Sequence, residues 1–152
     1  MNMASHNAPD VSEAMHVGIA GAGGIAFGAA ALLESFGHKA MLWSPSGERT
    51  QQLAAGEPLT ATGALEGTFH PGVAQSAREL VEANEVILIA LPAYGHKAVM
   101  DAIAPHIRAG QTVLISSHAS FGALYLNRLL AKRGIDVAIV AWGTTVVSCR
   151  QP

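Results

Sequence analysis

A glycine-rich turn between a strand pattern and a helix pattern constrains this chain most. The segment from Gly21 to Ala26 reads Gly-Ala-Gly-Gly-Ile-Ala and fits the pattern G-x-G-x-x-A. A short apolar run at 16–20 precedes it, and an alanine-rich stretch at 23–36 follows it. Gly21 permits a tight turn, Gly23 lets a phosphate approach the backbone, and Ala26 lets the helix pack closely on the strand.

This turn predicts a dinucleotide-binding site, with a small-residue packing turn as the alternative. The free N–H groups and the partial positive charge at a helix N-terminus attract a pyrophosphate. The preceding strand and the following helix add weight that an isolated G-x-G-x-x-A lacks. The residues expected to contact the cofactor here are Gly21, Ala22, Gly23, Gly24, Ile25 and Ala26.

The rest of the chain alternates strand-like and helix-like segments. Strands are expected at 39–43, 85–91, 112–116 and 137–141, and helices at 48–55, 77–83, 96–108 and 121–133. Residues 59–69 carry two glycine-containing turns and predict a small hairpin or an irregular strand. Apolar strands separated by helices predict an α/β fold: a doubly wound, mainly parallel sheet of Rossmann type in three layers.

Length and composition limit the number of domains and the class of partner. The 152 residues suffice for one domain, expected at 15–152 behind a flexible tail at 1–14. The net charge is −2 and the nine Lys and Arg residues are spread out, which argues against nucleic acid and anionic membranes as partners.

The glycine-rich stretch at 17–33 is a poor membrane span. The one cysteine, Cys149, fits a reducing, cytoplasmic location. The histidines do not pair at helical spacing, so no metal site is expected.

The residues after the second strand pattern bear on the choice between NADP and NAD. An NAD site usually has Asp or Glu about 20 residues after the turn, facing the ribose 2′-hydroxyl. This chain has Ser44 there, followed by Ser46 and Arg49. Hydroxyl donors and a guanidinium suit a 2′-phosphate, so NADP is favoured, with NAD as the alternative. In a second interpretation Ser44 caps the next helix and Arg49 is solvated. Separately, a rotated loop could present Glu48 to the ribose.

Two further loops follow strand patterns expected in the sheet interior, where ligands of open α/β sheets bind at the carboxyl ends. The candidate residues are Leu91, Pro92, Ala93 and Tyr94 in the first loop and Ser116 and His118 in the second. The first loop is expected to line the cofactor's ribose or nicotinamide, and the second to hold the nicotinamide amide or the substrate. The alternatives are a plain turn with Tyr94 and His96 exposed, and a polar loop with Ser120 as a helix cap.

Several of these segments together resemble the N-terminal half of the octopine/nopaline (opine) dehydrogenases. They are the glycine turn, the 91–96 loop, Ser116-Ser117-His118 and Ala141-Trp142-Gly143-Thr144-Thr145. The region from about residue 15 onward is also similar to the cofactor domains of glycerol-3-phosphate dehydrogenases and ketopantoate reductases. The resemblance implies reductive condensation of an amino acid with a 2-keto acid, in which the imine carbon takes a hydride from NAD(P)H.

The resemblance further implies a second, helical domain that carries the catalytic His and its supporting acid groups. The chain stops at Pro152, after the last strand pattern, so we expect that domain to be absent and assign no catalytic residue. The chain is then expected to bind the dinucleotide but to be inactive, or nearly so, without a separate helical domain or chain. Apolar surface left uncovered would favour a homodimer. The alternatives are a stand-alone NAD(P)-binding or sensing module and, less favoured, a binder of flavin or sugar nucleotides.

Overall fold

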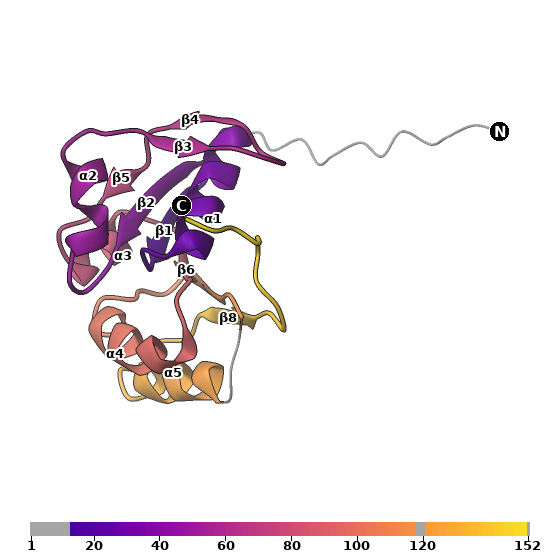
Figure 1. Cartoon of the computed structure of the whole chain (residues 1–152). Helices are drawn as coiled ribbons and strands as arrows, with labels where there is room; N and C mark the ends of the chain where they lie inside the picture. The colour runs from indigo at the N-terminus through magenta and orange to yellow at the C-terminus, as the bar shows by residue number, and fades with distance from the viewer. Residues whose placement is uncertain (1–12, 118–120, 152) are drawn as a thin grey trace.

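Six parallel strands form the central sheet of the computed structural model, which describes residues 13–117 and 121–151 (Figure 1). Across the sheet the order is β5 (Gly72–Val73), β2 (Lys39–Trp43), β1 (His16–Ala20), β6 (Val86–Ile89), β7 (Thr112–Ile115) and β8 (Ala138–Ala141). The chain starts in the middle at β1, builds toward one edge, and from β6 builds toward the other. This is the order of a doubly wound Rossmann-type sheet, so the predicted fold class is confirmed.

Helices cover both faces of the sheet and give the predicted three layers. One face carries α1 (Gly24–Ser35), and the other carries α3 (Ala77–Glu82), α4 (Ala93–Ile103) and α5 (Gly122–Ala131). The short 3-10 helix η1 (Glu48–Thr50) and α2 (Gln51–Ala54) follow β2. The hairpin of β3 (Leu59–Ala61) and β4 (Gly67–Phe69) lies beside α1. No helix in the described part of the chain is long and apolar enough to cross a membrane.

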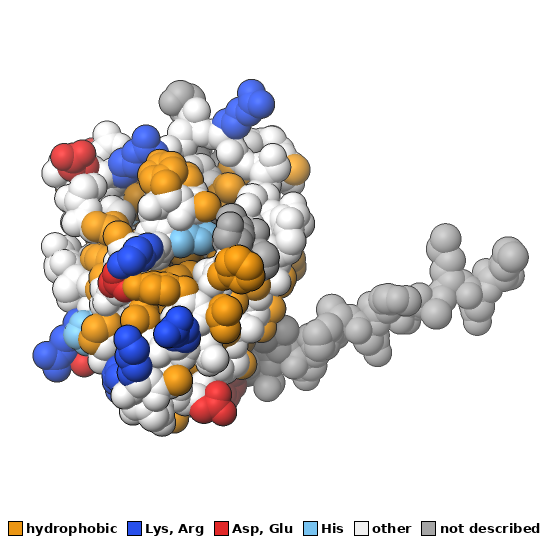
Figure 2. Space-filling view, turned by 90° about the horizontal axis from the view of Figure 1, so that it is seen from below, with side chains coloured by type: hydrophobic (Ala, Val, Ile, Leu, Met, Phe, Trp, Pro, Cys, Tyr) orange, Lys and Arg blue, Asp and Glu red, His pale blue; other side chains and the backbone are white. Residues whose placement is uncertain are grey.

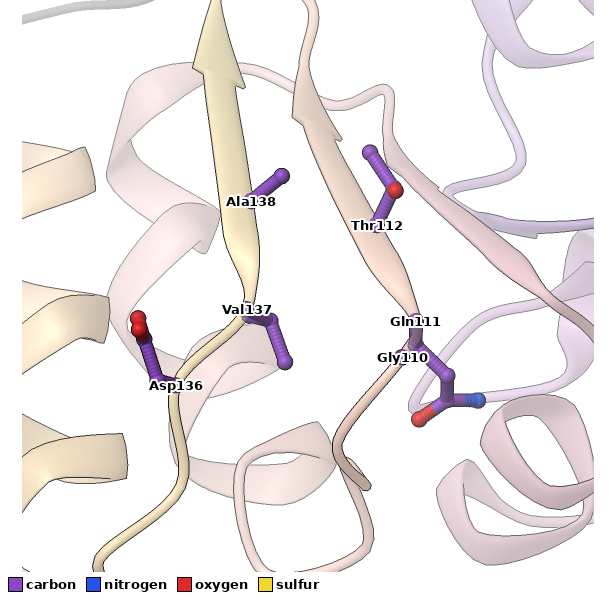
Figure 3. A pocket seen from close by; sticks show the side chains of 6 residues that line it. All are labelled: Gly110, Gln111, Thr112, Asp136, Val137 and Ala138. Atoms are coloured by element: carbon purple, nitrogen blue, oxygen red, sulfur yellow. The ribbon is translucent and has the colours of Figure 1, made fainter.

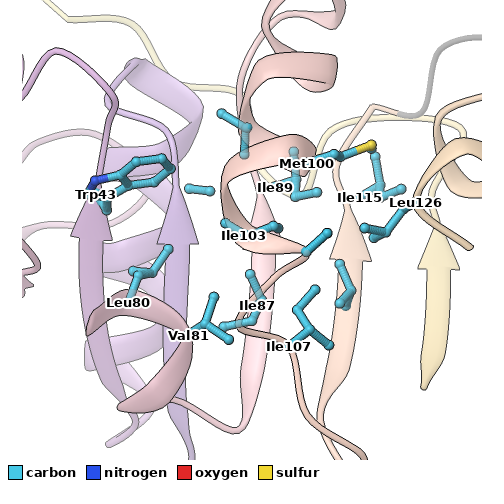
Figure 4. Close-up of a cluster of buried hydrophobic side chains, with 14 of the residues drawn as sticks. Trp43, Leu80, Val81, Ile87, Ile89, Met100, Ile103, Ile107, Ile115 and Leu126 are labelled. Atoms are coloured by element: carbon cyan, nitrogen blue, oxygen red, sulfur yellow. The ribbon is translucent and has the colours of Figure 1, made fainter. Parts of the chain in front are cut away.

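Two apolar clusters hold the layers together. The larger one joins the sheet to α3, α4 and α5 and includes Trp43, Leu80, Val81, Ile87, Ile89, Met100, Ile103, Ile107, Ile115 and Leu126 (Figure 4). The smaller one joins the opposite face to α1, where Ala26 and Ala30 pack against a face that includes Ile19 and Leu42. Each fully buried Ile or Leu contributes about 2 kcal/mol of transfer free energy. The small side chains of α1 let that helix lie close to the sheet.

Local interactions fix where α3 begins. The Ser76 side chain accepts a hydrogen bond from the Glu79 N–H (3.1 Å), and the Glu79 carboxylate accepts one from the Gln75 N–H (2.7 Å). These two bonds form a variant of the capping box, in which Glu79 bonds the N–H of Gln75, one residue before the cap, and not that of Ser76. The connection from β5 into α3 therefore has a defined geometry.

The structure corrects the sequence prediction at three places. The hairpin predicted at 59–69 is confirmed, but the sheet has a sixth strand that was not predicted, β5, whose pairing of Gly72 with Met41 is too short to leave a sequence pattern. The helix predicted at 48–55 divides into η1 and α2. Helix α4 begins at Ala93 rather than His96, because Pro92 (φ −58°) takes the cap position and the chain turns helical directly after it. Residues 1–12 of the predicted tail lie outside the described residues.

The turn from β1 into α1 passes very close to the end of β6. Gly21 has a φ of +150°, and a side-chain carbon placed there would lie 2.1 Å from the carbonyl oxygen of Ala90. The Gly21 N–H also donates a hydrogen bond to the Trp43 carbonyl at the end of β2 (2.8 Å). Only glycine fits this position, because any side chain would collide with backbone that belongs to the neighbouring strand.

Replacing Gly21 with Ala should therefore destabilise the fold strongly. We expect the free energy of unfolding in urea to fall by about 3 kcal/mol or more, because the clash is with backbone and cannot relax by a side-chain rotation. The matched control is Gly37→Ala, which also has a positive φ (+83°) but has open space around the added carbon. That control should cost only about 1 kcal/mol. Equal losses in the two variants would show that the close approach to Ala90 is not the controlling contact.

Candidate dinucleotide-binding site

The parallel sheet brings the predicted site residues to one edge. Gly21 follows β1, Ser44 follows β2, Leu91 lies just after β6, and Ser116 follows β7. Because these four strands are parallel, their carboxyl ends lie at the same edge. The strand order reverses between β1 and β6, and in open α/β sheets ligands bind beside this switch point.

The N-terminus of α1 has the properties of an anion-binding site. Gly23 is its cap residue and no side chain caps the helix. The N–H groups of the first helical turn have no acceptor within the helix, and they carry the positive end of its dipole. A side-chain carbon placed at Gly23 would meet nothing within 4 Å, so there is room for a phosphate against the backbone. Ala22 and Ile25 instead contribute side chains to the core cluster around α1, and Ala26 is fully buried there.

Ser44 has a buried hydroxyl oxygen with no hydrogen-bond partner in the described residues. Its carbonyl accepts a bond from the Gly47 N–H (3.1 Å), but its side chain caps nothing, because Gly47 is the cap residue of η1. The interpretation of Ser44 as a helix cap is therefore wrong. A buried hydroxyl without a partner costs about 1–3 kcal/mol. Such a group fits a ligand contact, while Ser46 and Arg49 lie exposed in the next few residues.

The loop after β6 is shorter than the sequence indicated, because α4 already begins at Ala93. Tyr94 is 91% exposed, whereas His96 is only 5% exposed. The His96 ring nitrogen Nε2 lies 2.9 Å from the Leu91 carbonyl oxygen. The alternative in which His96 is exposed is therefore wrong, since the first turn of α4 directs its side chain inward.

The loop after β7 is bonded to the C-terminal segment. Ser116 is buried, and its hydroxyl oxygen accepts a hydrogen bond from the Val146 N–H (3.4 Å). Ser117 adopts a left-handed conformation (φ +58°), and its N–H donates to the Thr144 carbonyl (3.1 Å). The Ser116 hydroxyl is thus used within the fold. His118 and Ser120 lie outside the described residues, so their predicted roles stay predictions.

Residues 142–151 form a segment that runs from β8 back across the molecule to α1 (Figure 1). A carbon added at Gly28 would lie 2.2 Å from Cys149 Sγ, and one added at Gly24 would lie 2.7 Å from the Cys149 carbonyl oxygen. Gly24 and Gly28 are four residues apart and therefore share one face of the helix. That spacing was a signal in the sequence for close packing on this face, but it did not identify Cys149 as the contact.

The contact at Gly28 reverses the usual effect of placing Ala in a helix. A Gly→Ala change inside a helix normally stabilises by about 1 kcal/mol. Here Gly28→Ala should destabilise the chain by about 1 kcal/mol in urea unfolding, because the added methyl overpacks against Cys149 and Val147. In a Cys149→Ala background the penalty should shrink, giving a coupling free energy above about 0.5 kcal/mol. Stabilisation by Gly28→Ala alone would contradict this packing.

A shallow, open pocket at the opposite edge of the sheet lies far from these residues. It is lined by Gly110, Gln111, Thr112, Asp136, Val137 and Ala138, at the amino ends of β7 and β8 (Figure 3). The buried Gln111 amide donates to the carbonyls of Val81 and Asn84 (2.7 Å each), so it is occupied within the fold. The described residues contain no group of three or more His, Cys, Asp or Glu side chains that could hold a metal.

Hydrophobic side chains also gather on the face formed by α4 and α5, among Lys and Arg residues (Figure 2). One ion pair lies on this face. The side-chain hydrogen bond between Lys97 and Asp101 (2.7 Å) raises the pKa of Lys97 and lowers that of Asp101, and Tyr125 also donates to Asp101. These three side chains join α4 to α5 and bond one another.

Comparison with known proteins agrees with this geometry. Residues 16–120 match the family described as NADP oxidoreductase, coenzyme F420-dependent. The opine dehydrogenase of Arthrobacter sp. (strain 1C) is 32% identical over 133 residues, which cover 86% of this chain and 36% of that protein. A solved octopine dehydrogenase structure with NADH and pyruvate has a TM-score of 0.77 at 17% identity, covering 90% of this chain and 37% of that one. Apo yersinopine dehydrogenase has a TM-score of 0.70 at 22% identity, covering 89% and 35%.

The fold and the glycine turn define the class: the chain is an NAD(P)-binding domain of Rossmann type. It belongs to the NADP oxidoreductase, coenzyme F420-dependent, family, because the family model matches more than half of its residues. The predicted resemblance to opine dehydrogenases is confirmed, and the matched region spans 36% of the Arthrobacter relative.

Proposed function

We propose that this chain binds NADP along the carboxyl edge of its sheet, as the cofactor-binding half of an opine-type dehydrogenase. The observation that carries the proposal is the uncapped N-terminus of α1, with open space at Gly23. Free backbone donors and the positive end of the helix dipole suit a pyrophosphate at that position. The adenosine side then extends toward the end of β2, and the nicotinamide side toward the ends of β6 and β7.

The preference for NADP over NAD rests on the residues after β2. The buried Ser44 hydroxyl has no partner in the part of the chain that the structure describes, and Arg49 follows on η1 within the same short connection. No carboxylate occurs between Trp43 and Gly47, so none directly after the strand repels a 2′-phosphate. The solved octopine dehydrogenase contains NADH, so this likeness supports a dinucleotide, and the NADP preference depends on the residues of this chain.

Catalysis, in this proposal, requires residues beyond those described. When bound, the nicotinamide supplies the hydride for reductive condensation of an amino acid with a 2-keto acid. That transfer needs the substrate held against the ring with water excluded. The described residues bind and orient the dinucleotide, but we assign none of them as acid or base. The matched region is 36% of the Arthrobacter opine dehydrogenase, so most of that relative lies outside the match. A helical domain or chain formed by residues of that kind would complete the site.

Titration of the purified chain with NADPH and NADH tests the cofactor preference. NADPH should bind more tightly, and Arg49→Ala should weaken NADPH binding about ten-fold with little change for NADH, because one charge-assisted contact to the 2′-phosphate is lost. Ser44→Asp should weaken NADPH and favour NADH, since a carboxylate repels phosphate and accepts from ribose hydroxyls. Arg128→Ala, an exposed arginine on α5, is the control and should change neither affinity.

Equal or tighter binding of NADH would reject the role of Ser44 and Arg49 and would leave the glycine turn as an NAD site. Binding of neither nucleotide by the folded chain would reject the proposed function.

The chain alone should bind NADPH but not consume it when an amino acid and a 2-keto acid are added. Loss of NADPH absorbance in that mixture would contradict the need for a second domain. Binding without turnover, even after addition of the helical domain of an opine dehydrogenase, would favour the stand-alone binding or sensing module.

A further inference from the structure

We propose that His96 is a positioning residue for the nicotinamide half of the site, because its ring bonds the loop after β6 and lies beside the start of α5. This inference rests on the proposed function. His96 is 5% exposed, and neither the dinucleotide turn nor the residues after β2 account for an imidazole buried at this edge of the sheet.

The first contact of His96 is with the loop that precedes it. Nε2 lies 2.9 Å from the Leu91 carbonyl oxygen. A carbonyl oxygen only accepts hydrogen bonds, so Nε2 carries a proton and donates it. The bond joins residues five positions apart, so the connection from β6 into α4 becomes a loop closed by a hydrogen bond.

This connection has little freedom once the bond is made. The Gly95 N–H donates to the Pro92 carbonyl (2.9 Å), and a carbon added at Gly95 would lie 2.4 Å from Leu91 Cδ1. The Leu91 side chain therefore folds over Gly95, and the His96 bond holds the Leu91 carbonyl in place. The loop expected to border the nicotinamide side is set by these three contacts.

The other side of the ring faces α5. A carbon added at Gly122 would lie 3.8 Å from His96 Nδ1 and 3.3 Å from Met100 Cε. Gly122 is the first residue of α5, which follows the loop after β7. The His96 ring is thus bonded to the segment that follows β6 and lies beside the start of α5, so that a side chain at Gly122 would meet it. The contacts named here all lie on the nicotinamide side of the switch point, away from Gly23 and Ser44.

This placement predicts that the two halves of the site respond differently to substitution of His96. Asn places its amide nitrogen near the position of Nδ1 and cannot reach Leu91, whereas Gln places one near Nε2. His96→Asn should weaken NADPH binding about ten-fold, because one hydrogen bond at a partly buried carbonyl is lost, and His96→Gln should retain most of the affinity. Binding of 2′,5′-ADP, which lacks the nicotinamide half, should stay within about two-fold in both variants. His106→Asn, three residues beyond the end of α4, is the control.

Amide hydrogen exchange in the cofactor-free chain gives a second readout. The Gly95 N–H should exchange about ten-fold faster in His96→Asn than in His96→Gln. In His96→Asn the local opening that exposes this N–H does not have to break a side-chain bond to the Leu91 carbonyl. The inference is overturned if His96→Asn leaves both the exchange rate and the ratio of NADPH to 2′,5′-ADP affinity unchanged, or lowers both affinities equally. It is also overturned, together with the proposed function, if the wild-type chain binds neither nucleotide.

Discussion

The close approach of the β1–α1 turn to the end of β6 is the constraint on which the rest of the structure depends. With no side chain at Gly21, the turn lies against the Ala90 carbonyl, and its N–H bonds to Trp43 at the end of β2. Three strand ends therefore meet at the point where the strand order reverses. The start of α1, whose free N–H groups and dipole suit a pyrophosphate, is therefore positioned by backbone contacts at Gly21.

Helix α1 is closely packed on two sides as a result. Its alanines face the sheet, and Gly24 and Gly28 face the C-terminal segment, where Cys149 and Val147 occupy the space that side chains would take. Each glycine inside a helix costs about 1 kcal/mol relative to alanine. Trp142 and Val146 pack against the cluster around α1, and this burial offsets that cost. The C-terminal segment thereby connects the loop after β7 to the helix that begins the site.

Much of this fold could be predicted because it is encoded locally. Apolar runs marked five of the six sheet strands, and the spacing of small residues marked the turn that opens α1. The strand β5 could not be predicted, since only Gly72 and Val73 pair and their partners lie some thirty residues away along the chain. The burial of His96 was missed for a related reason: it depends on where α4 begins. With the helix starting at Ala93, His96 belongs to the first turn and its side chain points into the core.

The two halves of the candidate site differ in how their polar groups are used, and this difference was not visible in the sequence. Ser44 and Ser116 both follow strands at the same edge, and both were candidates for cofactor contact. In the fold, the Ser116 hydroxyl is bonded to Val146, whereas the Ser44 hydroxyl is buried with no partner among the described residues. A buried hydroxyl of this kind favours a ligand able to bond it. The residues after β2 are therefore the ones on which the proposed choice between dinucleotides rests, while the Ser116 hydroxyl after β7 is held by a contact within the protein.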